Sequence, residues 1–334
     1  MRRIFWAAVI CCALAASARA QELRGSGSTF AFPLMTKWIE AYGQAGGSRL
    51  VYLPTGSAAG LNDIRHEIVD FAVSEAPLDS AQLLRDGLTQ FPLMIGAIVP
   101  VLNVDGLSPG QLRLTGPLLA DIYLGKVVTW NDPAITAINP GLKLPELKIH
   151  VVHRSDGSGS SFTWADYLSK ASDDWKVRVG AKMMVDWPTG VGVRHSNGVA
   201  ESVARIRGAI GYLDYHNAVR RKLAYAQVRN RAGTFVAPGS ASFQAAIRDV
   251  DWNKDRDFDV TLTDAPAPDA YPVMALSFAV IRSYPKVAGR ARDLRAFFQW
   301  AMTNGQDMAG SLQYVPLPSS LIRQIDGSWR TEKP

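Results

Sequence analysis

The chain has 334 residues, of which 47% are hydrophobic and 20% are charged. This composition is typical of globular proteins and excludes an intrinsically disordered chain. At roughly 150 residues per domain, the length predicts two domains, each large enough to bury its own core. The formal net charge is +6 at pH 7. Because no stripe of Lys and Arg with interleaved aromatic residues accompanies it, we do not expect a nucleic-acid partner.

The N-terminus has the pattern of an export signal. Arg2 and Arg3 precede an apolar run at 4–16, and Ala18-Arg19-Ala20 follows as a cleavage site with small residues. The run is shorter than the ~20 residues that cross a bilayer. We therefore expect residues 1–20 to be a cleaved signal peptide and the protein to be periplasmic.

Removal of this segment changes the chemistry of the remaining chain. It takes away three arginines and no acidic residue, so the formal charge falls from +6 to +3. It also takes away both cysteines, Cys11 and Cys12. Thiol catalysis, thiolate metal sites and disulfides are then excluded from the mature protein.

Along the rest of the chain, short apolar runs alternate with helical patterns. The runs that predict strands are 50–53, 69–74, 98–103, 149–153, 209–213 and 275–281. The patterns that predict helices are 32–42, 57–67, 118–124, 160–168, 198–206 and 291–303. This alternation predicts an α/β fold with largely parallel sheets. Since no long linker occurs, we expect two domains joined by short crossings of the chain.

Three stretches place glycine and hydroxyl residues directly before a predicted helix, at 25–30, 55–60 and 155–161. First-turn N–H groups and the helix dipole favour an anion at such a position. Taken singly, each stretch also fits an ordinary N-cap or turn. Their repetition, and the arginine beside the third stretch, favour an oxyanion site.

Two charged residues stand where predicted strands end. Arg154 follows the strand at 149–153, at the edge where ligands gather in open α/β sheets, and can bind an oxyanion through two hydrogen bonds. Asp156 could orient it, although the two could also form a simple surface pair. Glu75 follows the strand at 69–74. A carboxylate there can accept a hydrogen bond from protonated phosphate, whereas it would repel sulfate, which has no proton to donate.

Several longer segments resemble one known family. They are Asp-Ile-Tyr-Leu-Gly-Lys at 121–126, Trp-Asn-Asp at 130–132, Asn-Pro-Gly-Leu-Lys-Leu-Pro at 139–145, Val-His-Arg-Ser-Asp-Gly-Ser-Gly at 152–159, Gly-Ala-Ile-Gly-Tyr at 208–212 and the stretch 25–30. Together, and in the family's order along the chain, they strongly resemble the periplasmic phosphate-binding proteins of phosphate ABC transporters (PstS type). The resemblance implies a type II periplasmic binding fold: two α/β lobes, a central ligand cleft and two crossover hinge strands. It places lobe 1 at 21–97 and 275–334, and lobe 2 at 98–274.

The resemblance also implies a set of phosphate-binding residues. They are Thr29 and Phe30 as the first contact, Ser57 at the second helix, Arg154 as the cationic ligand with Asp156 supporting it, and Ser158, Gly159 and Ser160 at the third helix. At the Ser160 position the family usually has Thr. Glu75 stands where the family usually has Asp as acceptor of the phosphate proton. The extra methylene leaves affinity and oxyanion selectivity open, while the acceptor chemistry is retained.

We therefore expect a monomeric receptor that captures inorganic phosphate, closes by hinge rotation near 96–99 and 274–277, and docks on the membrane permease subunits of a phosphate ABC transporter. No cofactor or metal is expected. The chain is not expected to be an enzyme, since no nucleophile, base and orienting residue form a set. Alternatives are a receptor for another oxyanion (arsenate, phosphonate or sulfate), a secreted phosphohydrolase, or a sensing protein that uses the fold without transport.

Overall fold

The computed structural model describes residues 22–253 and 257–331, so the predicted signal peptide lies outside the described residues. The strands are β1 Leu23–Gly27, β2 Leu50–Leu53, β3 Phe71–Ser74, β4 Leu88–Leu102, β5 Arg113–Leu114, β6 His150–Arg154, β7 Val191–Val193, β8 Ala209–Asp214, β9 Ala224–Tyr225, β10 Gln227–Arg229, β11 Phe235–Val236 and β12 Met274–Arg282. The helices are α1 Phe32–Gln44, α2 Ser57–Arg65, α3 Ser80–Asp86, α4 Gly116–Tyr123, α5 Pro133–Thr136, α6 Gly159–Ala171, α7 Asp173–Arg178, α8 His195–Arg205, α9 Tyr215–Arg220, α10 Ser240–Ile247, α11 Ala288–Asn304, α12 Gln306–Ser311 and α13 Ser319–Thr331.

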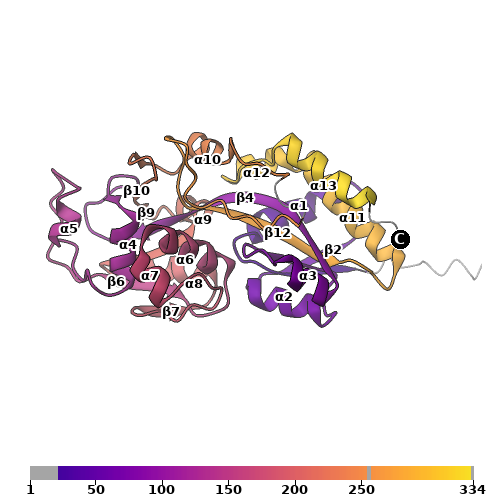
Figure 1. Ribbon diagram of the computed structural model, residues 1–334, viewed down its shortest axis with the longest axis horizontal. Coiled ribbons are helices and arrows are strands. Elements are labelled where there is room, and N and C mark those ends of the chain that lie inside the picture. The colour runs from indigo at the N-terminus through magenta and orange to yellow at the C-terminus, as the bar shows by residue number, and fades with distance from the viewer. Residues whose placement is uncertain (1–21, 254–256, 332–334) are drawn as a thin grey trace, which may run out of the picture.

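Two lobes lie side by side and are joined by the long strand β4 (Figure 1). Its first part, Leu88 to Ala97, pairs with β12, and its second part, from Ile98 onward, pairs with β8 and β9. The main sheet therefore runs through both lobes in the order β2-β1-β3-β12-β4-β8-β6-β7. The first lobe holds β1, β2, β3 and β12, and the second holds β6, β7, β8 and β9.

In the main sheet, the prediction of largely parallel pairing is correct for β1, β2 and β3 and for β6, β7 and β8, and wrong for every pairing of the crossing strands β4 and β12. β1 pairs in parallel with β2 and β3, and β6 pairs in parallel with β7 and β8. The pairings of β12 with β3 and β4, and of β4 with β8 and β9, are antiparallel. The reason is topological: β4 and β12 carry the chain between the lobes in opposite directions, so no helical crossover joins them.

The helices cover the sheet with their apolar faces. In α1, Leu34, Met35 and Trp38 are buried, which is the spacing of one helical face. In the first lobe, α11 and α13 pack Phe298 and Trp329 edge-on against Phe91 of β4. Figure 1 shows α11, α12 and α13 together on one side of that lobe.

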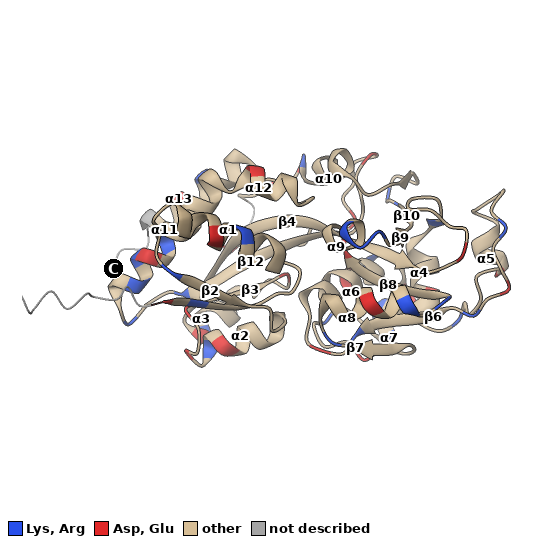
Figure 2. Ribbon diagram, turned by 180° about the vertical axis from the view of Figure 1, so that it is seen from behind, with Lys and Arg blue, Asp and Glu red and all other residues tan. Residues whose placement is uncertain are grey.

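Every strand and helix that the sequence predicts is present, with ends shifted by a few residues. The largest shift is in β4, which begins ten residues before the predicted start at residue 98. The elements that the sequence does not predict are strands β1, β5, β7, β9, β10 and β11 and helices α3, α5, α7, α9, α10, α12 and α13. Within the described ranges, no helix combines the length and apolarity that a bilayer crossing requires. Acidic and basic positions are interspersed over both lobes (Figure 2).

Candidate functional site

Three loops, each running from a strand into a helix, meet between the lobes. β1 leads into α1 and β2 into α2 in the first lobe, and β6 leads into α6 in the second. The amide of Ala58 donates to the Gly157 carbonyl at 3.1 Å, and the amide of Gly159 donates to Ser57 Oγ at 3.1 Å. The starts of α2 and α6 therefore touch across the interface between the lobes.

Arg154 ends β6 and provides a buried positive charge at this meeting point. Its side chain is 2% exposed and forms a two-pronged ion pair with Asp156: Nε donates to Oδ1 at 2.7 Å and Nη2 donates to Oδ2. Its Nη1 donates to Thr29 Oγ1 of the first lobe at 3.1 Å. Asp156 also accepts a hydrogen bond from the His195 amide at 3.1 Å. The guanidinium is thus held from one side and reaches across to the other lobe.

The backbone of Arg154 is held by aromatic residues of the second lobe. Its amide donates to the Tyr212 hydroxyl at 3.1 Å, and that hydroxyl also bonds Ser161 Oγ at 2.6 Å. The Trp187 indole N–H donates to the Arg154 carbonyl at 3.1 Å, and its ring stacks on His153 and Tyr212. These contacts fix the direction in which the arginine leaves the strand.

Glu75 follows β3 and provides a buried carboxylate; the residue is 4% exposed. Ser277 Oγ, on β12, donates to Glu75 Oε1 at 2.9 Å, and Ser57 Oγ donates to Oε2 at 3.4 Å. The Ser28 hydroxyl donates to the same carboxylate. Glu75 is therefore surrounded by hydroxyl donors, and no cation forms an ion pair with it among the described residues.

The two carboxylates of the site have opposite protonation tendencies. Burial raises the pKa of Glu75, and this effect exceeds the lowering by Ser28, Ser277, the Arg154 charge and Ser57. Burial also acts to raise the pKa of Asp156, but the hydrogen bonds and charge of Arg154 outweigh it, so that pKa is lowered. Asp156 is therefore a permanent counter-charge for Arg154, whereas Glu75 is the group whose proton affinity the site has increased.

Two glycines allow the loops to approach this closely. At Gly56, φ is +100°, and an added Cβ would lie 2.9 Å from Asp156 Oδ2. At Gly159, an added Cβ would lie 2.3 Å from Glu75 Oε2 and 2.7 Å from the Glu75 amide nitrogen. Contacts under 3.0 Å to a Cβ essentially do not occur. A side chain at either position would force the lobes apart.

Thr29 and Phe30 enter the site in different ways. Thr29 Oγ1 lies 2.8 Å from Ser196 Oγ and accepts from the Ser196 amide at 3.4 Å, so it joins the start of α8 to the start of α1. The Phe30 ring packs edge-on against Tyr314, and the Tyr314 hydroxyl donates to the Phe30 carbonyl at 2.6 Å. Since the ring is occupied in the core, only the Phe30 backbone remains for a ligand.

The structure brings six of the nine predicted site residues into direct contact with one another. Direct contacts join Thr29, Arg154 and Asp156 in one set and Ser57, Glu75 and Gly159 in another. Ser158 is the N-cap of α6 and accepts from the Ser161 amide, and Ser160 is buried in the first turn of that helix. Ser158, Ser160 and the Phe30 ring form no hydrogen bond or ring contact with Arg154 or Glu75; their place in the site rests on the helix starts that hold them.

Sequence reasoning missed three residues that complete the cluster: Ser28, Ser277 and Ser196. Ser28 lies inside the stretch 25–30 but was not singled out. Ser277 lies in the predicted strand 275–281, where alternation alone does not distinguish a hydroxyl that faces a carboxylate. Ser196 was missed because the predicted helix starts at residue 198, whereas α8 begins at His195.

Chemically, the cluster can surround a small anion with donors on all sides and one acceptor. The donors are the guanidinium, the hydroxyl groups and the amides at three helix starts. The acceptor is Glu75. Within 22–253 and 257–331, no three His, Cys, Asp or Glu side chains gather in a way that could hold a metal ion.

Comparison with known proteins agrees with this arrangement of two lobes. Residues 13–304 match the family model described as "PBP superfamily domain". In structure, the chain resembles a phosphate-bound periplasmic phosphate-binding protein (PfluDING), with a TM-score of 0.72 at 18% identity over 92% of this chain and 93% of that one. It also resembles an ancestral soluble variant of the human phosphate binding protein, with a TM-score of 0.74 at 17% identity over 92% and 93% of the two chains. These likenesses confirm the predicted two-lobe periplasmic binding fold.

Sequence relatives narrow the class further. The phosphate-binding protein PstS of Xylella fastidiosa (strain 9a5c) is 45% identical over 93% of this chain and 85% of the relative. PstS of Haemophilus influenzae (strain ATCC 51907 / DSM 11121 / KW20 / Rd) is 41% identical over 94% of both chains. The chain therefore belongs to the PstS family of phosphate-binding proteins. Because this is a family of binding proteins, the prediction that the chain is not an enzyme is confirmed.

Proposed function

We propose that this chain binds inorganic phosphate between its two lobes and delivers it, in the periplasm, to the permease subunits of a phosphate ABC transporter. The relatives and the phosphate-bound structural neighbour support the ligand class. The observation that carries the proposal is that the same buried region between the lobes holds both the Arg154 guanidinium and the Glu75 carboxylate, which forms no ion pair among the described residues.

In this proposal each helix start donates to a different side of the anion. The Phe30 amide and the Thr29 hydroxyl serve at α1, Ser57 serves at α2, and Ser158, Gly159 and Ser160 serve at α6. Arg154 supplies the positive charge, and Asp156 keeps its fork in a fixed orientation. Charge-assisted hydrogen bonds from a planar fork are stronger and more directional than those from neutral donors.

Glu75 then selects the protonation state of the ligand. At neutral pH phosphate keeps at least one proton and can donate it to a carboxylate oxygen, whereas sulfate has none. A carboxylate facing an oxyanion without an intervening proton leaves two buried charges of like sign together, which is strongly unfavourable. Hydroxyls of Ser28, Ser57 and Ser277 hold the carboxyl group in place.

Capture would proceed by closure of the lobes about the crossing strands. We propose that lobe 1 comprises 21–97 and 275–334 and lobe 2 comprises 98–274, with hinge motion near 96–99 and 274–277. The change of partner along β4 at Ala97 and Ile98 supports this boundary. Hydrogen bonds between the lobes, from Arg154 to Thr29 and from Gly159 to Ser57, would form on closure and exclude water.

Delivery requires export and a membrane partner. The N-terminal pattern at 1–20 supports secretion through a cleaved signal peptide, and the family supports docking on a permease whose other subunits hydrolyse ATP. We propose that the receptor acts as a monomer without a cofactor.

Isothermal titration of the phosphate-stripped mature protein tests the proposal. Phosphate, arsenate and sulfate are titrated separately at pH 7.5. We expect saturable phosphate binding at micromolar or lower Kd, measurable arsenate binding because arsenate also carries a proton, and no heat with sulfate. Absence of phosphate binding, or equal binding of sulfate, would overturn the assignment.

A further inference from the structure

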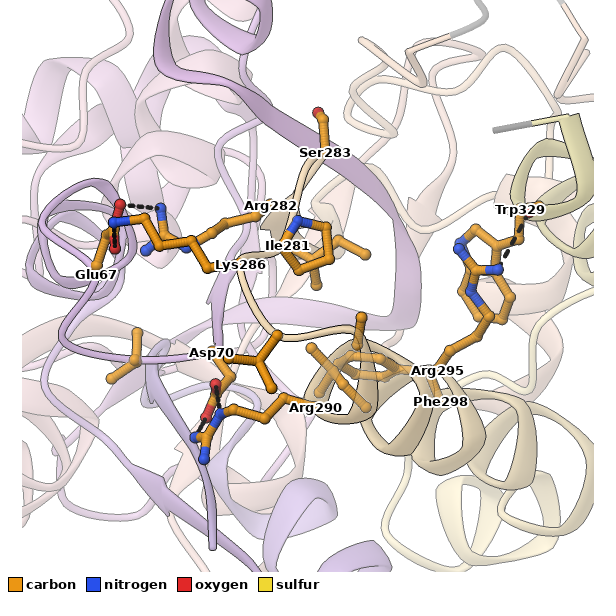
Figure 3. Close-up of a pocket in the computed structure, with 15 residues that line it drawn as sticks. Glu67, Asp70, Ile281, Arg282, Ser283, Lys286, Arg290, Arg295, Phe298 and Trp329 are labelled. Atoms are coloured by element: carbon orange, nitrogen blue, oxygen red, sulfur yellow. Dashed lines mark hydrogen bonds and ion pairs between the residues drawn. The ribbon is translucent and has the colours of Figure 1, made fainter. Parts of the chain in front are cut away.

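A cavity lies in the first lobe, away from the loops that meet between the lobes (Figure 3). It is bounded by Val69 and Asp70 before β3, by the loop after β12, and by α11 and α13. Glu75 of the phosphate site follows the opposite end of β3. The two sites are therefore at opposite ends of that strand, and the inference below does not depend on phosphate binding.

The cavity has a volume of about 270 Å³ and walls that are largely apolar. The apolar lining residues are Val69, Ile281, Pro285, Val287, Ala291, Leu294, Phe298 and Trp329. Pockets for drug-sized ligands span ~300–1,000 Å³. A compact molecule with a hydrocarbon body therefore fits this cavity better than a large cofactor does.

Positive charge exceeds negative charge around this apolar space. Among the described residues, four cationic side chains line the cavity against two acidic ones: Arg282, Lys286, Arg290 and Arg295 against Glu67 and Asp70. Arg290 is neutralised by a two-pronged pair with Asp70, and Arg282 and Lys286 share Glu67. One positive charge is left over at the Glu67 side of the cavity.

Arg295 accounts for the remaining excess. Its Nη1 donates to the Trp329 carbonyl at 3.3 Å, and its guanidinium carbon lies 5.9 Å from the centre of the Trp329 ring. No carboxylate of the described residues forms an ion pair with it. Figure 3 shows Arg295 extending toward Trp329, while Lys286 and Arg282 extend toward Glu67 on the opposite side of the cavity.

We propose that this cavity is a second ligand site, which binds a small carboxylate with an apolar body. The carboxylate pairs with the Arg295 guanidinium, whose planar fork matches two carboxylate oxygens. The hydrocarbon body lies against Ile281, Pro285 and Val287, which are partly or fully exposed, and removes their surface from water. A dianion such as inorganic phosphate is disfavoured, because the apolar walls cannot replace its hydration.

Titration with octanoate tests this assignment, with octan-1-ol as the uncharged control of equal chain length. We expect saturable 1:1 binding of octanoate in the micromolar to millimolar range and binding of octan-1-ol at least tenfold weaker. Equal binding of octanoate and octan-1-ol would show that the carboxylate does not pair with Arg295 and would refute the proposed ligand class. Absence of saturable octanoate binding would overturn the site.

Variants locate the binding. Arg295→Gln keeps a hydrogen-bonding side chain but removes the charge, and should weaken octanoate binding at least fivefold. Arg292→Gln is the matched control on the same helix, because Arg292 is 82% exposed and does not line the cavity. Ala291→Leu fills the cavity without changing charge and should abolish binding at an unchanged melting temperature. Equal effects of Arg295→Gln and Arg292→Gln, or full binding by Ala291→Leu, would refute the location. Phosphate titration of each variant should match the wild type.

Discussion

The closest approach between the lobes predicts a strong effect from one added methyl group. In Gly159→Ala the new Cβ would lie 2.3 Å from Glu75 Oε2 and 2.7 Å from the Glu75 amide nitrogen, about 1 Å short of the 3.4 Å at which ordinary contact begins. The backbone nitrogen cannot move aside as a flexible side chain can. Closure must therefore stop early, and the bond from the Gly159 amide to Ser57 Oγ, 3.1 Å long, is stretched.

Overpacking of this kind costs about 1–3 kcal/mol. At 1.4 kcal/mol per tenfold change, phosphate affinity should fall by roughly 5- to 150-fold. The stability of the protein without phosphate should not fall, because alanine stabilises a helical position relative to glycine by up to ~1 kcal/mol. Titration with phosphate and thermal unfolding without it therefore separate the two effects.

A matched variant controls for the general effect of replacing glycine by alanine. Gly289 lies in the first turn of α11, and an added Cβ there meets no atom within 4 Å. Gly289→Ala should bind phosphate like the wild type. If Gly159→Ala also binds like the wild type, or if both variants lose affinity equally, the closed contact between Glu75 and α6 is not part of binding.

Three further outcomes follow from the site. Arg154→Gln leaves Asp156 buried without its counter-charge, so the free energy of unfolding should fall by about 3–5 kcal/mol and phosphate affinity by at least ~100-fold; urea unfolding and titration measure both. Burial raises the pKa of Glu75 above 4.5, so its contribution to stability is complete below pH 4.5 and is lost as the pH rises through the raised value. The melting temperature of the unliganded wild type, relative to Glu75→Gln, should therefore decline from pH 4.5 upward, and a constant difference would contradict the shift. In Gly96→Ala the new Cβ would lie 2.6 Å from Phe30 Cζ and 3.1 Å from Tyr314 Cδ1. We therefore expect the free energy of unfolding, measured with urea, to fall by about 1–3 kcal/mol. An unchanged free energy of unfolding would show that the two aromatic rings can move aside without cost.

The fold could be predicted where local pattern and tertiary environment agree. The strands at 50–53 and 209–213 and the helix from residue 57 are close to the observed elements, because each has one clear apolar period and a turn signal before it. Strand β4 shows where this fails. Pro92, Gly96 and Pro100 interrupt its apolar run, yet it continues through both lobes, because the pairing with β12 shifts register between Met94 and Pro92 and accommodates the proline there.

Strand β1 shows a related limit. Its sequence, Leu-Arg-Gly-Ser-Gly, has almost no strand propensity, and the prediction placed these glycines only in a loop before a helix. Gly27 adopts φ +129° and an added Cβ would lie 2.3 Å from the Val73 carbonyl oxygen. The glycines are needed because neighbouring strands approach closely, which a single sequence does not reveal.

For the site, helix starts and strand ends could be predicted, but contacts across the chain could not. Arg154 and Asp156 are two residues apart, so their pairing could be anticipated. The bond from Ser277 to Glu75 spans 202 residues and depends on β12 lying beside β3. This pairing is fixed by the crossing strands and leaves no local signal in the sequence.

The central claim is that the Glu75 carboxylate accepts a hydrogen bond from the proton on the ligand. The most direct measurement compares phosphate and sulfate binding in the wild type and in Glu75→Gln at pH 7.5. We predict that the wild type binds phosphate and not sulfate, and that Glu75→Gln binds phosphate more weakly and gains sulfate binding, since an amide can donate to an oxygen that carries no proton. Unchanged rejection of sulfate by Glu75→Gln would contradict the account, because selectivity would then come from the donors at the helix starts.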